Sequence, residues 1–258
     1  MPWRQAQFNT AIKALIKPAG SVYKPDISVF YSKVLKLNTN QPSGLIEIHV
    51  AVLLFGLAGL FGKFLVLPAW SIVLGRTGFA TIALGAVLLF SKGRHRLHGT
   101  KDMGLFCLLG LILAVHWITF FHAIQVSSVA VGLLAFSTFP VFITCMEPFW
   151  FKEKRRAIDT ATALLVMAGL IIMVYPSGFG GQVFSGVCWG AVSGFTFAIL
   201  SLLNRKWVCE YPPVLIAFYQ NAFASLALLP MLAWATISID AGQVGLLAFL
   251  GVVCTALS

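Results

Sequence analysis

Two cations lie inside apolar stretches of this 258-residue chain, on either side of Pro68. Lys63 precedes Pro68 closely enough for its ammonium group to extend to a membrane surface, and contact with a substrate or gate is the alternative. Arg76 lies eight residues beyond Pro68, or ~12 Å at helical rise, which is too deep for such an extension. A buried arginine needs partners. Either backbone carbonyls accept its hydrogen bonds, or it contacts a substrate or a gate.

Other polar residues also interrupt apolar stretches. His116, beside Trp117, is either a packing residue with satisfied hydrogen bonds or part of a cavity near the membrane midplane. Glu147 is either solvated near one membrane surface or a buried carboxyl that carries protons. Lys63 and Arg76 have no acidic residue at their depth in the apolar stretches, which favours a site for a carboxylate or another anionic group.

Composition places these residues in a membrane protein. The chain is 59% hydrophobic and 10% charged, whereas a soluble domain is about 45–50% apolar and about 25% charged. A helix of about 20 apolar residues spans a bilayer. The sequence predicts an all-α polytopic protein with 7–8 spans, from eight apolar stretches: Leu45–Leu67, Ala69–Phe90, Met103–Ala123, Ser128–Trp150, Ala157–Tyr175, Val183–Leu203, Val214–Trp234 and Gly242–Ser258.

The formal net charge is +10, and the basic residues predict an orientation. Lysines and arginines precede the first span and follow the second, fourth and sixth, whereas the loops after the first, third, fifth and seventh spans contain none. The positive-inside rule then predicts a multi-pass protein of the cytoplasmic (inner) membrane with a cytoplasmic N-terminus. Such a distribution is a topology signal, so we expect no nucleic-acid partner.

Two sequence matches predict an internal duplication. GFATIAL at Gly78–Leu84 recurs as AFASLAL at Ala222–Leu228, 144 residues later. Leu109 and Gly110 recur as Leu250 and Gly251, 141 residues later. Because the repeated unit has an odd number of spans, five, its second copy runs in the opposite direction. Inverted repeats of this kind build many secondary transporters.

The duplication predicts three regions: a cytoplasmic tail over 1–44, a first repeat over 45–176, and a second repeat over 183–258 that is incomplete in its third helix. The tail is expected to be either an interfacial helix or an extension without fixed structure. Alignment of the repeats places Ala198 opposite Lys63 and Gln220 opposite Arg76. The fold therefore does not require a cation at either position, and Gln220 joins the candidate substrate-binding or gating residues.

Proline and glycine positions suggest where helices bend or approach closely. Pro140 lies near the middle of the fourth span and could provide a hinge there. Gly186, Gly190 and Gly194 form one face of the sixth span and are expected to pack closely against another helix. If that helix is the first span, which has glycines of its own, the two halves could rock against each other.

Two segments carry a resemblance to a known family. WSIVLGRTGFATIAL resembles the second helix, and FPVFITCMEPFWFKEKRR the end of the fourth helix, of the ten-helix drug/metabolite transporter superfamily with its two EamA-like domains. On that match Glu153 occupies the position of a loop glutamate and Gly169 that of a glycine in the fifth helix. The resemblance covers roughly residues 46–258 and lacks counterparts of the last two helices. It implies export of amino acids, related organic metabolites or drugs.

These observations predict a secondary transporter that moves a small metabolite by alternating access, with efflux as the expected direction. The alternative is a non-transporting remnant, or a half-unit that needs another chain. No catalytic constellation, metal-ligand cluster or nucleotide-binding loop is present in the sequence, so we expect no enzyme activity, cofactor or metal. Membrane lipids and a small-molecule substrate are the expected partners, and self-association is an open alternative.

Overall fold

A computed structural model describes residues 42–91, 97, 99–151, 157–175, 181–208, 210–234 and 239–256. Every regular element in these ranges is a helix. The packing below concerns residues 47–258, which form one compact unit. The elements are α3 (Pro42–Phe64), α4 (Ala69–Phe90), α5 (Thr100–Val126), α6 (Val129–Phe136), α7 (Phe139–Phe151), α8 (Ala157–Val174), α9 (Gly181–Trp207), α10 (Pro213–Leu228), η2 (Leu229–Ala233), α11 (Ala241–Gly251) and the π-helical turn η3 (Val252–Ala256).

The prediction of an all-α polytopic membrane protein is confirmed. Six helical segments in the described ranges are long and apolar enough to cross a bilayer, and two shorter apolar helices accompany them, His49–Phe64 and Ala241–Ala256. Together they correspond to the eight apolar stretches of the sequence. The predicted tail lies outside the described residues up to position 41, and residues 42–44 begin α3.

Several helices begin at residues suited to that position. Pro68 and Pro212 precede α4 and α10, and their carbonyls accept hydrogen bonds from the amides of Ile72 and Ile216, both at 3.2 Å. Proline is favoured near a helix start because it lacks the amide proton that would have no partner there. Asp240 closes a capping box at the start of α11.

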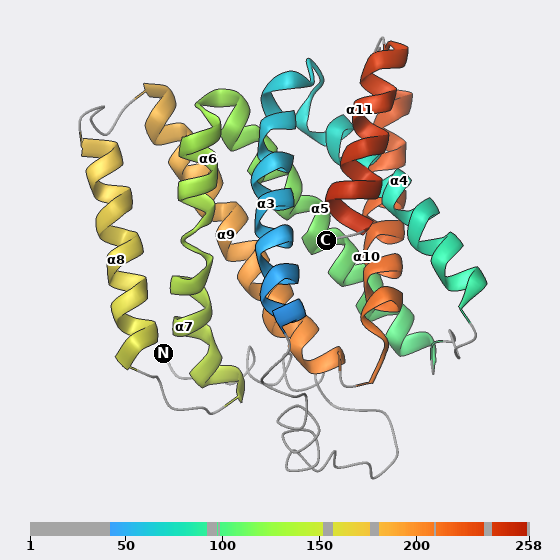
Figure 1. Cartoon of the computed structure of the whole chain (residues 1–258), viewed down its shortest axis with the longest axis horizontal. Coiled ribbons are helices and arrows are strands. Elements are labelled where there is room, and N and C mark those ends of the chain that lie inside the picture. The colour runs from blue at the N-terminus through green and yellow to red at the C-terminus, as the bar shows by residue number, and fades with distance from the viewer. Residues whose placement is uncertain are drawn as a thin grey trace, which may run out of the picture. The chain divides into compact units, whose positions relative to one another are not determined.

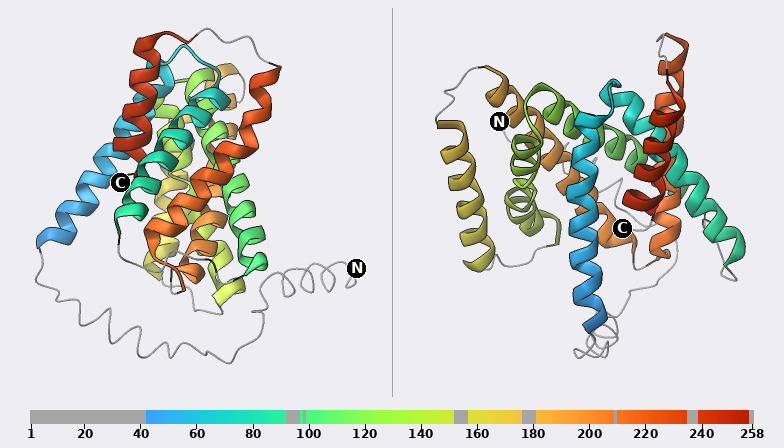
Figure 2. Two further views of the ribbon diagram at one scale, coloured as in Figure 1. Left: turned by 90° about the vertical axis from the view of Figure 1, so that its right-hand side faces the viewer. Right: turned by 45° about the horizontal axis from the view of Figure 1, so that its top comes forward.

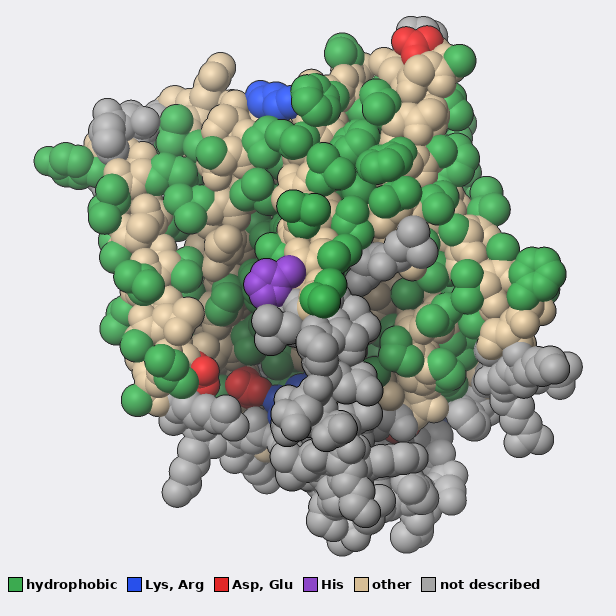
Figure 3. Space-filling view, in the orientation of Figure 1, with side chains coloured by type: hydrophobic (Ala, Val, Ile, Leu, Met, Phe, Trp, Pro, Cys, Tyr) green, Lys and Arg blue, Asp and Glu red, His purple; other side chains and the backbone are tan. Residues whose placement is uncertain are grey.

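The helices run between two ends of the bundle, and their connections alternate from one end to the other (Figure 1). We call them the Lys63 end, where α3 ends and α4 begins, and the Arg205 end, where α9 ends and α10 begins. Hydrophobic side chains cover the helix faces in view, and the few charged side chains among them lie toward the two ends (Figure 3). This distribution suits a bundle surrounded by lipid.

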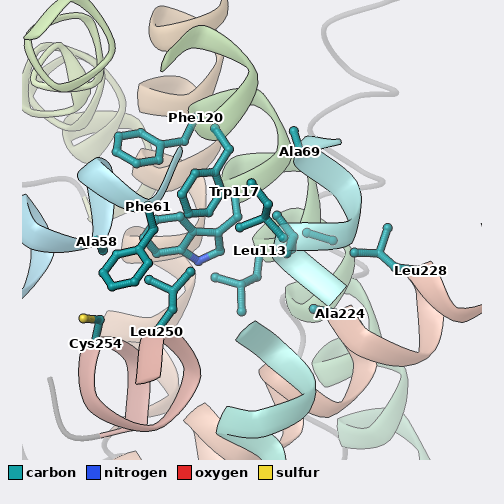
Figure 4. Packing of buried hydrophobic residues seen from close by; sticks show 14 of the residues in the cluster. Ala58, Phe61, Ala69, Leu113, Trp117, Phe120, Ala224, Leu228, Leu250 and Cys254 are labelled. Atoms are coloured by element: carbon teal, nitrogen blue, oxygen red, sulfur yellow. The ribbon is translucent and has the colours of Figure 1, made fainter. Parts of the chain in front are cut away.

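Helix α5 is at the centre of the packing. It contacts α4, α6, α9 and α10, while α4 also packs against α10 and α11 (Figure 2). Trp117 of α5 lies within the hydrophobic core cluster, among Phe61 of α3, Leu250 of α11 and its α5 neighbours Leu113 and Phe120 (Figure 4). The core therefore joins helices from both predicted repeats.

A close helix crossing reveals how α5 meets α10. A Cβ atom added at Gly110 would lie 2.5 Å from the Cβ of Phe223, 2.9 Å from the amide nitrogen of Ala224 and 3.0 Å from the carbonyl oxygen of Gln220. Only a glycine leaves room for a backbone at this distance.

The crossing of α11 with α4 has the same design. A Cβ atom added at Gly251 would lie 2.5 Å from the carbonyl oxygen of Arg76, 2.7 Å from the Cβ of Phe79 and 3.1 Å from the amide nitrogen of Ala80. Each of these three residues lies 144 positions before its counterpart around Gly110. The contacts thus show the same offsets as the sequence matches, and the α4–α11 crossing is packed in the same way as the α5–α10 crossing.

The fourth span differs from its prediction. The chain breaks at Ser137 and Thr138 into α6 and α7, and Pro140 is the second residue of α7. The Thr138 carbonyl accepts from the amides of Val141 at 2.9 Å and Phe142 at 3.4 Å, so Thr138 starts the new helix. Pro140 therefore begins a helix after the break, where its missing amide proton costs nothing.

The glycine face of the sixth span, α9, packs closely against α6 and its surroundings, so its partner is not the first span, whose contact with it is the condition for rocking of the two halves. A Cβ at Gly186 would collide with Ser127, and one at Gly190 would lie 2.4 Å from the Cβ of Ala135. A Cβ at Gly194 would lie 2.8 Å from the hydroxyl of Thr138. The small residues of α9 fit here because they face Ala135 of α6 and the short hydroxyl side chains of Ser127 and Thr138 on either side of that helix.

Candidate functional site

Arg76 lies in the first half of α4 and is buried, with 1% of its surface exposed. Its Nε and Nη2 atoms donate to the hydroxyl of Thr255, at 3.1 and 2.7 Å. The guanidinium carbon lies 3.4 Å from the centroid of the Trp117 ring. The Nη1 atom is buried and has no hydrogen-bond partner. Backbone carbonyls are one of the two alternatives predicted for the partners of Arg76. The partners found are one hydroxyl, which accepts two hydrogen bonds, and one aromatic face, on which the guanidinium stacks.

A hydrogen bond at the turn η3 orients the Thr255 hydroxyl toward the guanidinium of Arg76. The hydroxyl donates to the carbonyl of Leu250, five residues earlier, at 2.9 Å. With its proton committed there, the hydroxyl oxygen offers its lone pairs to the guanidinium. Among the described residues the ion pair found is Glu147 with Arg205, so Arg76 carries its charge without a described carboxylate partner.

His116 has none of its surface exposed and is tied to α9. Its Nδ1 lies 3.0 Å from the carbonyl oxygen of Ser193 and 2.9 Å from the Ser193 hydroxyl, which donates to the His116 carbonyl at 3.1 Å. Because a carbonyl can only accept, we assign the ring proton to Nδ1. The Nε2 atom, buried and without a partner, then presents a lone pair.

Aromatic rings separate and surround these two polar groups. The His116 ring centroid lies 4.7 Å from that of Trp117, 5.4 Å from that of Phe136 and 5.1 Å from that of Phe197. The structure thus brings three predicted site residues together, Arg76, Trp117 and His116. They offer an N–H donor with positive charge, an acceptor nitrogen and π faces that attract cations or apolar groups.

Gln220 belongs to a separate polar cluster, and Arg76 is not part of it. Its amide nitrogen donates to the side-chain oxygen of Asn204 on α9. The neighbouring Asn221 donates to the Ala217 carbonyl at 2.8 Å, and its own side-chain oxygen is buried without a partner. Since α4 and α10 start at opposite ends of the bundle, Arg76 and Gln220 lie at matching depths from opposite ends.

Lys63 does not share a hydrogen-bond partner with Arg76. Its ammonium group is exposed at the Lys63 end and donates to the carbonyl of Gln125, at the end of α5, at 3.1 Å. Gln125 in turn donates to the Leu67 carbonyl at 2.8 Å. These residues line a surface hollow of about 420 Å³. Lys63 therefore connects the end of α3 to the end of α5 by a hydrogen bond, and it also lines the hollow.

Glu147 forms an ion pair with Arg205 that neither sequence-based interpretation included. The two side chains are 27% and 41% exposed, and they join α7 to α9 near the Arg205 end. The guanidinium carbon of Arg205 also lies 4.5 Å from the centroid of the Phe151 ring. Glu147 is thus a partly exposed member of an interhelical pair.

Sequence reasoning missed the partners of the predicted residues, namely Thr255, Ser193, Asn204 and Arg205. Each is a polar residue within or at the end of an apolar stretch, and that position was the available signal. The pairing itself depends on which helices become neighbours, which the spacing along one helix does not determine.

Thr255→Val is expected to lower the thermal stability of the purified protein, because it removes the acceptor from two buried guanidinium N–H groups. A buried donor without a partner costs about 1–3 kcal/mol. For a chain of this size that corresponds to a fall in Tm of about 2–10 °C. Thermal unfolding in detergent measures it. Thr162→Val is the matched control, since its exposed hydroxyl bonds only to its own helix, at the Ile158 carbonyl. Equal Tm values for the two variants would contradict the role of Thr255.

Curated relatives of the chain are named as transporters. It is 22% identical over 200 residues to the uncharacterized transporter YxxF of Bacillus subtilis strain 168, a match that covers 74% of this chain and 63% of that protein. It is 30% identical over 113 residues to an uncharacterized transporter of Archaeoglobus fulgidus, covering 43% and 40%. The chain thus spans less than two-thirds of each relative.

Similarity in fold and in family models extends over most of the chain. A crystal structure of another protein superposes with a TM-score of 0.62 at 20% sequence identity, covering 83% of this chain and 75% of that one, which supports the fold. The model of the EamA-like transporter family matches residues 42–175 and again residues 184–258. These two matches include α4, α5 and α9, the helices that carry Arg76, Trp117, His116 and Ser193. The chain therefore belongs to the EamA-like transporter family.

Proposed function

We propose that this multi-pass membrane protein is a secondary transporter for a small metabolite that carries a carboxylate and an amino group. The observation that carries the proposal is the buried guanidinium of Arg76, with one nitrogen lacking a partner and no acidic partner among the described residues. A charge buried without a counter-ion is costly. A substrate carboxylate would supply the missing charge and accept from Nη1.

His116 and Trp117 account for the other end of such a substrate. The Nε2 lone pair of His116 accepts a hydrogen bond from an N–H donor, and the ring faces beside it attract a cation. An α-amino acid presents both a carboxylate and an ammonium group. The amino-acid-like metabolites implied by the family resemblance fit this pair of groups.

Alternating access is supported by burial and by the repeat. With 1% of its surface exposed, Arg76 is reached only when neighbouring helices separate. The crossing of α11 with α4 and that of α5 with α10 are related by the repeat, and both are closed in the structure, so opening either one breaks a similar set of contacts. The two openings therefore cost similar free energy, which is what a transporter needs in order to face either side.

We propose that the Arg205 end faces the cytoplasm, with the N-terminus on the same side, and that the membrane is the cytoplasmic one. The lysines and arginines between the spans support this orientation. We further propose efflux, from the family resemblance, with an ion or substrate gradient as the energy source.

Counterflow in proteoliposomes tests the function. Liposomes containing the purified chain are preloaded with an unlabelled amino-acid mixture, and the probe is the same mixture radiolabelled outside. We expect labelled amino acids to accumulate transiently above the level in protein-free liposomes. Amino acids should compete for uptake, whereas their methyl esters and N-acetyl derivatives should not, because each lacks one of the two charged groups.

Equal competition by the methyl esters would contradict the role assigned to the carboxylate. Absence of counterflow for every amino acid, with a folded protein verified by thermal unfolding, would contradict the proposed substrate class. In that case the chain should be tested again with a second protein chain present, as expected for a half-unit.

A further inference from the structure

Helix α7 contributes less to the buried core than α5, α9 and α10 do. None of its residues is fully buried, in contrast to α5, α9 and α10. It packs against α8 and α9, and the break at Ser137 and Thr138 separates it from α6. Few buried apolar contacts mean a low local free energy of opening. Movement of this half of the fourth span is therefore expected to cost less than movement of α5, α9 or α10.

The break provides a defined pivot. The hydroxyls of Ser137 and Thr138 donate to carbonyls of α6, Leu133 at 2.9 Å and Ala135 at 2.7 Å, so the end of α6 is satisfied without α7. A Cβ at Gly194 would lie 2.8 Å from the Thr138 hydroxyl and 3.0 Å from the Phe136 carbonyl. The junction therefore rests directly on the backbone of α9, and α7 can turn about it without breaking its own hydrogen bonds.

The far end of α7 is attached to α9 by the Glu147–Arg205 ion pair. Stacking of the same guanidinium on Phe151, one turn further along α7, adds a second contact of Arg205 with that helix. The pair connects the first predicted repeat to the second near the Arg205 end. On α9, Arg205 lies on the same face as Gly194 and Ala198, because seven residues make two helical turns.

We propose that Glu147 and Arg205 form a latch that holds α7 against α9 and closes the Arg205 end of the bundle. Release of the ion pair lets α7 swing about the Ser137–Thr138 junction and exposes the α9 face beyond Gly194. The inference rests on the proposed transport function for its purpose, since a gate implies a route. The movement itself can be measured without any substrate.

Thiol labelling at Ala198 tests the latch. Ala198 is fully buried on α9, and Ala198→Cys adds only one sulfur atom. The parent variant in lipid nanodiscs is treated with a membrane-impermeant maleimide, and the modification rate at position 198 is read by mass spectrometry, so the native cysteines stay in place. Glu147→Gln and Arg205→Gln are each expected to raise that rate about two- to five-fold, the range for a partly exposed ion pair.

The double variant distinguishes a latch from two separate effects. Once either partner is neutral the pair is broken, so Glu147→Gln with Arg205→Gln should label no faster than the single variants. Asp159→Asn is the control, since it removes an acidic charge from the first turn of α8. It should label at the parent rate. Should Glu147→Gln disturb folding, Glu147→Asp keeps the charge and should also label at the parent rate.

Unchanged labelling in both single variants would overturn the latch, and so would a double variant whose rate is the product of the two single effects. These outcomes are independent of counterflow. Faster labelling without counterflow would leave the latch standing and contradict the proposed transport, whereas counterflow with unchanged labelling would do the reverse.

Discussion

Arg76→Gln is expected to lower amino-acid counterflow about 10- to 100-fold while the protein remains folded in the membrane. The substitution removes a charged donor whose hydrogen bond to a carboxylate is worth about 1.5–3 kcal/mol. Glutamine is the residue at the equivalent position of the second half, Gln220, so the helix packing accommodates it. Initial rates over a range of substrate concentrations separate the effect on KM from that on the maximal rate.

Two further variants show which property of Arg76 matters. Arg76→Lys keeps the charge but loses the planar group that stacks on Trp117 and donates twice to Thr255, so intermediate activity is expected. Lys63→Gln removes an exposed cation at the Lys63 end and should leave counterflow within about two-fold of the native rate. If Arg76→Gln leaves both transport and protein level unchanged, the proposed carboxylate site is wrong.

The second large effect is expected from Gly110→Ala and Gly251→Ala, the two glycines at the repeat-related crossings. In each case the new Cβ would lie within 2.5–3.1 Å of backbone or Cβ atoms of the facing helix, so the helices must separate. Overpacking of this kind costs about 1–3 kcal/mol. A fall in Tm of about 2–10 °C in detergent is expected, with similar values for the two variants because the two crossings are equivalent.

The repeat also supplies the controls. Gly104 and Gly245 are likewise counterparts at an offset of 141 residues, and nothing lies within 4 Å of a Cβ added at either one. Alanine favours a helix over glycine by up to about 1 kcal/mol, so Gly104→Ala and Gly245→Ala should keep or raise the Tm. A fall in Tm shared by all four variants would show that the close crossings are not the cause.

Several parts of the fold were predictable because a membrane leaves few choices. A bilayer requires stretches of about 20 apolar residues in helices, so composition alone led to the eight helical segments. The offsets of 144 and 141 residues predicted the duplication. In the structure, residues related by these offsets make equivalent close contacts at Gly110 and Gly251. Arg76 and His116 stood out as candidates because polar groups inside spans are costly.

The sequence by itself determined the apolar helical segments, predicted that they form two related halves, and singled out Arg76 and His116 as buried polar residues. Only the tertiary structure decided their partners. It paired Arg76 with Thr255 and Trp117, His116 with Ser193, and Glu147 with Arg205. It also directed the glycine face of α9 toward α6 and moved the break in the fourth span to Thr138. The reason is physical: hydrophobicity and helical spacing act along one segment, whereas partners depend on which helix faces approach closely enough to touch.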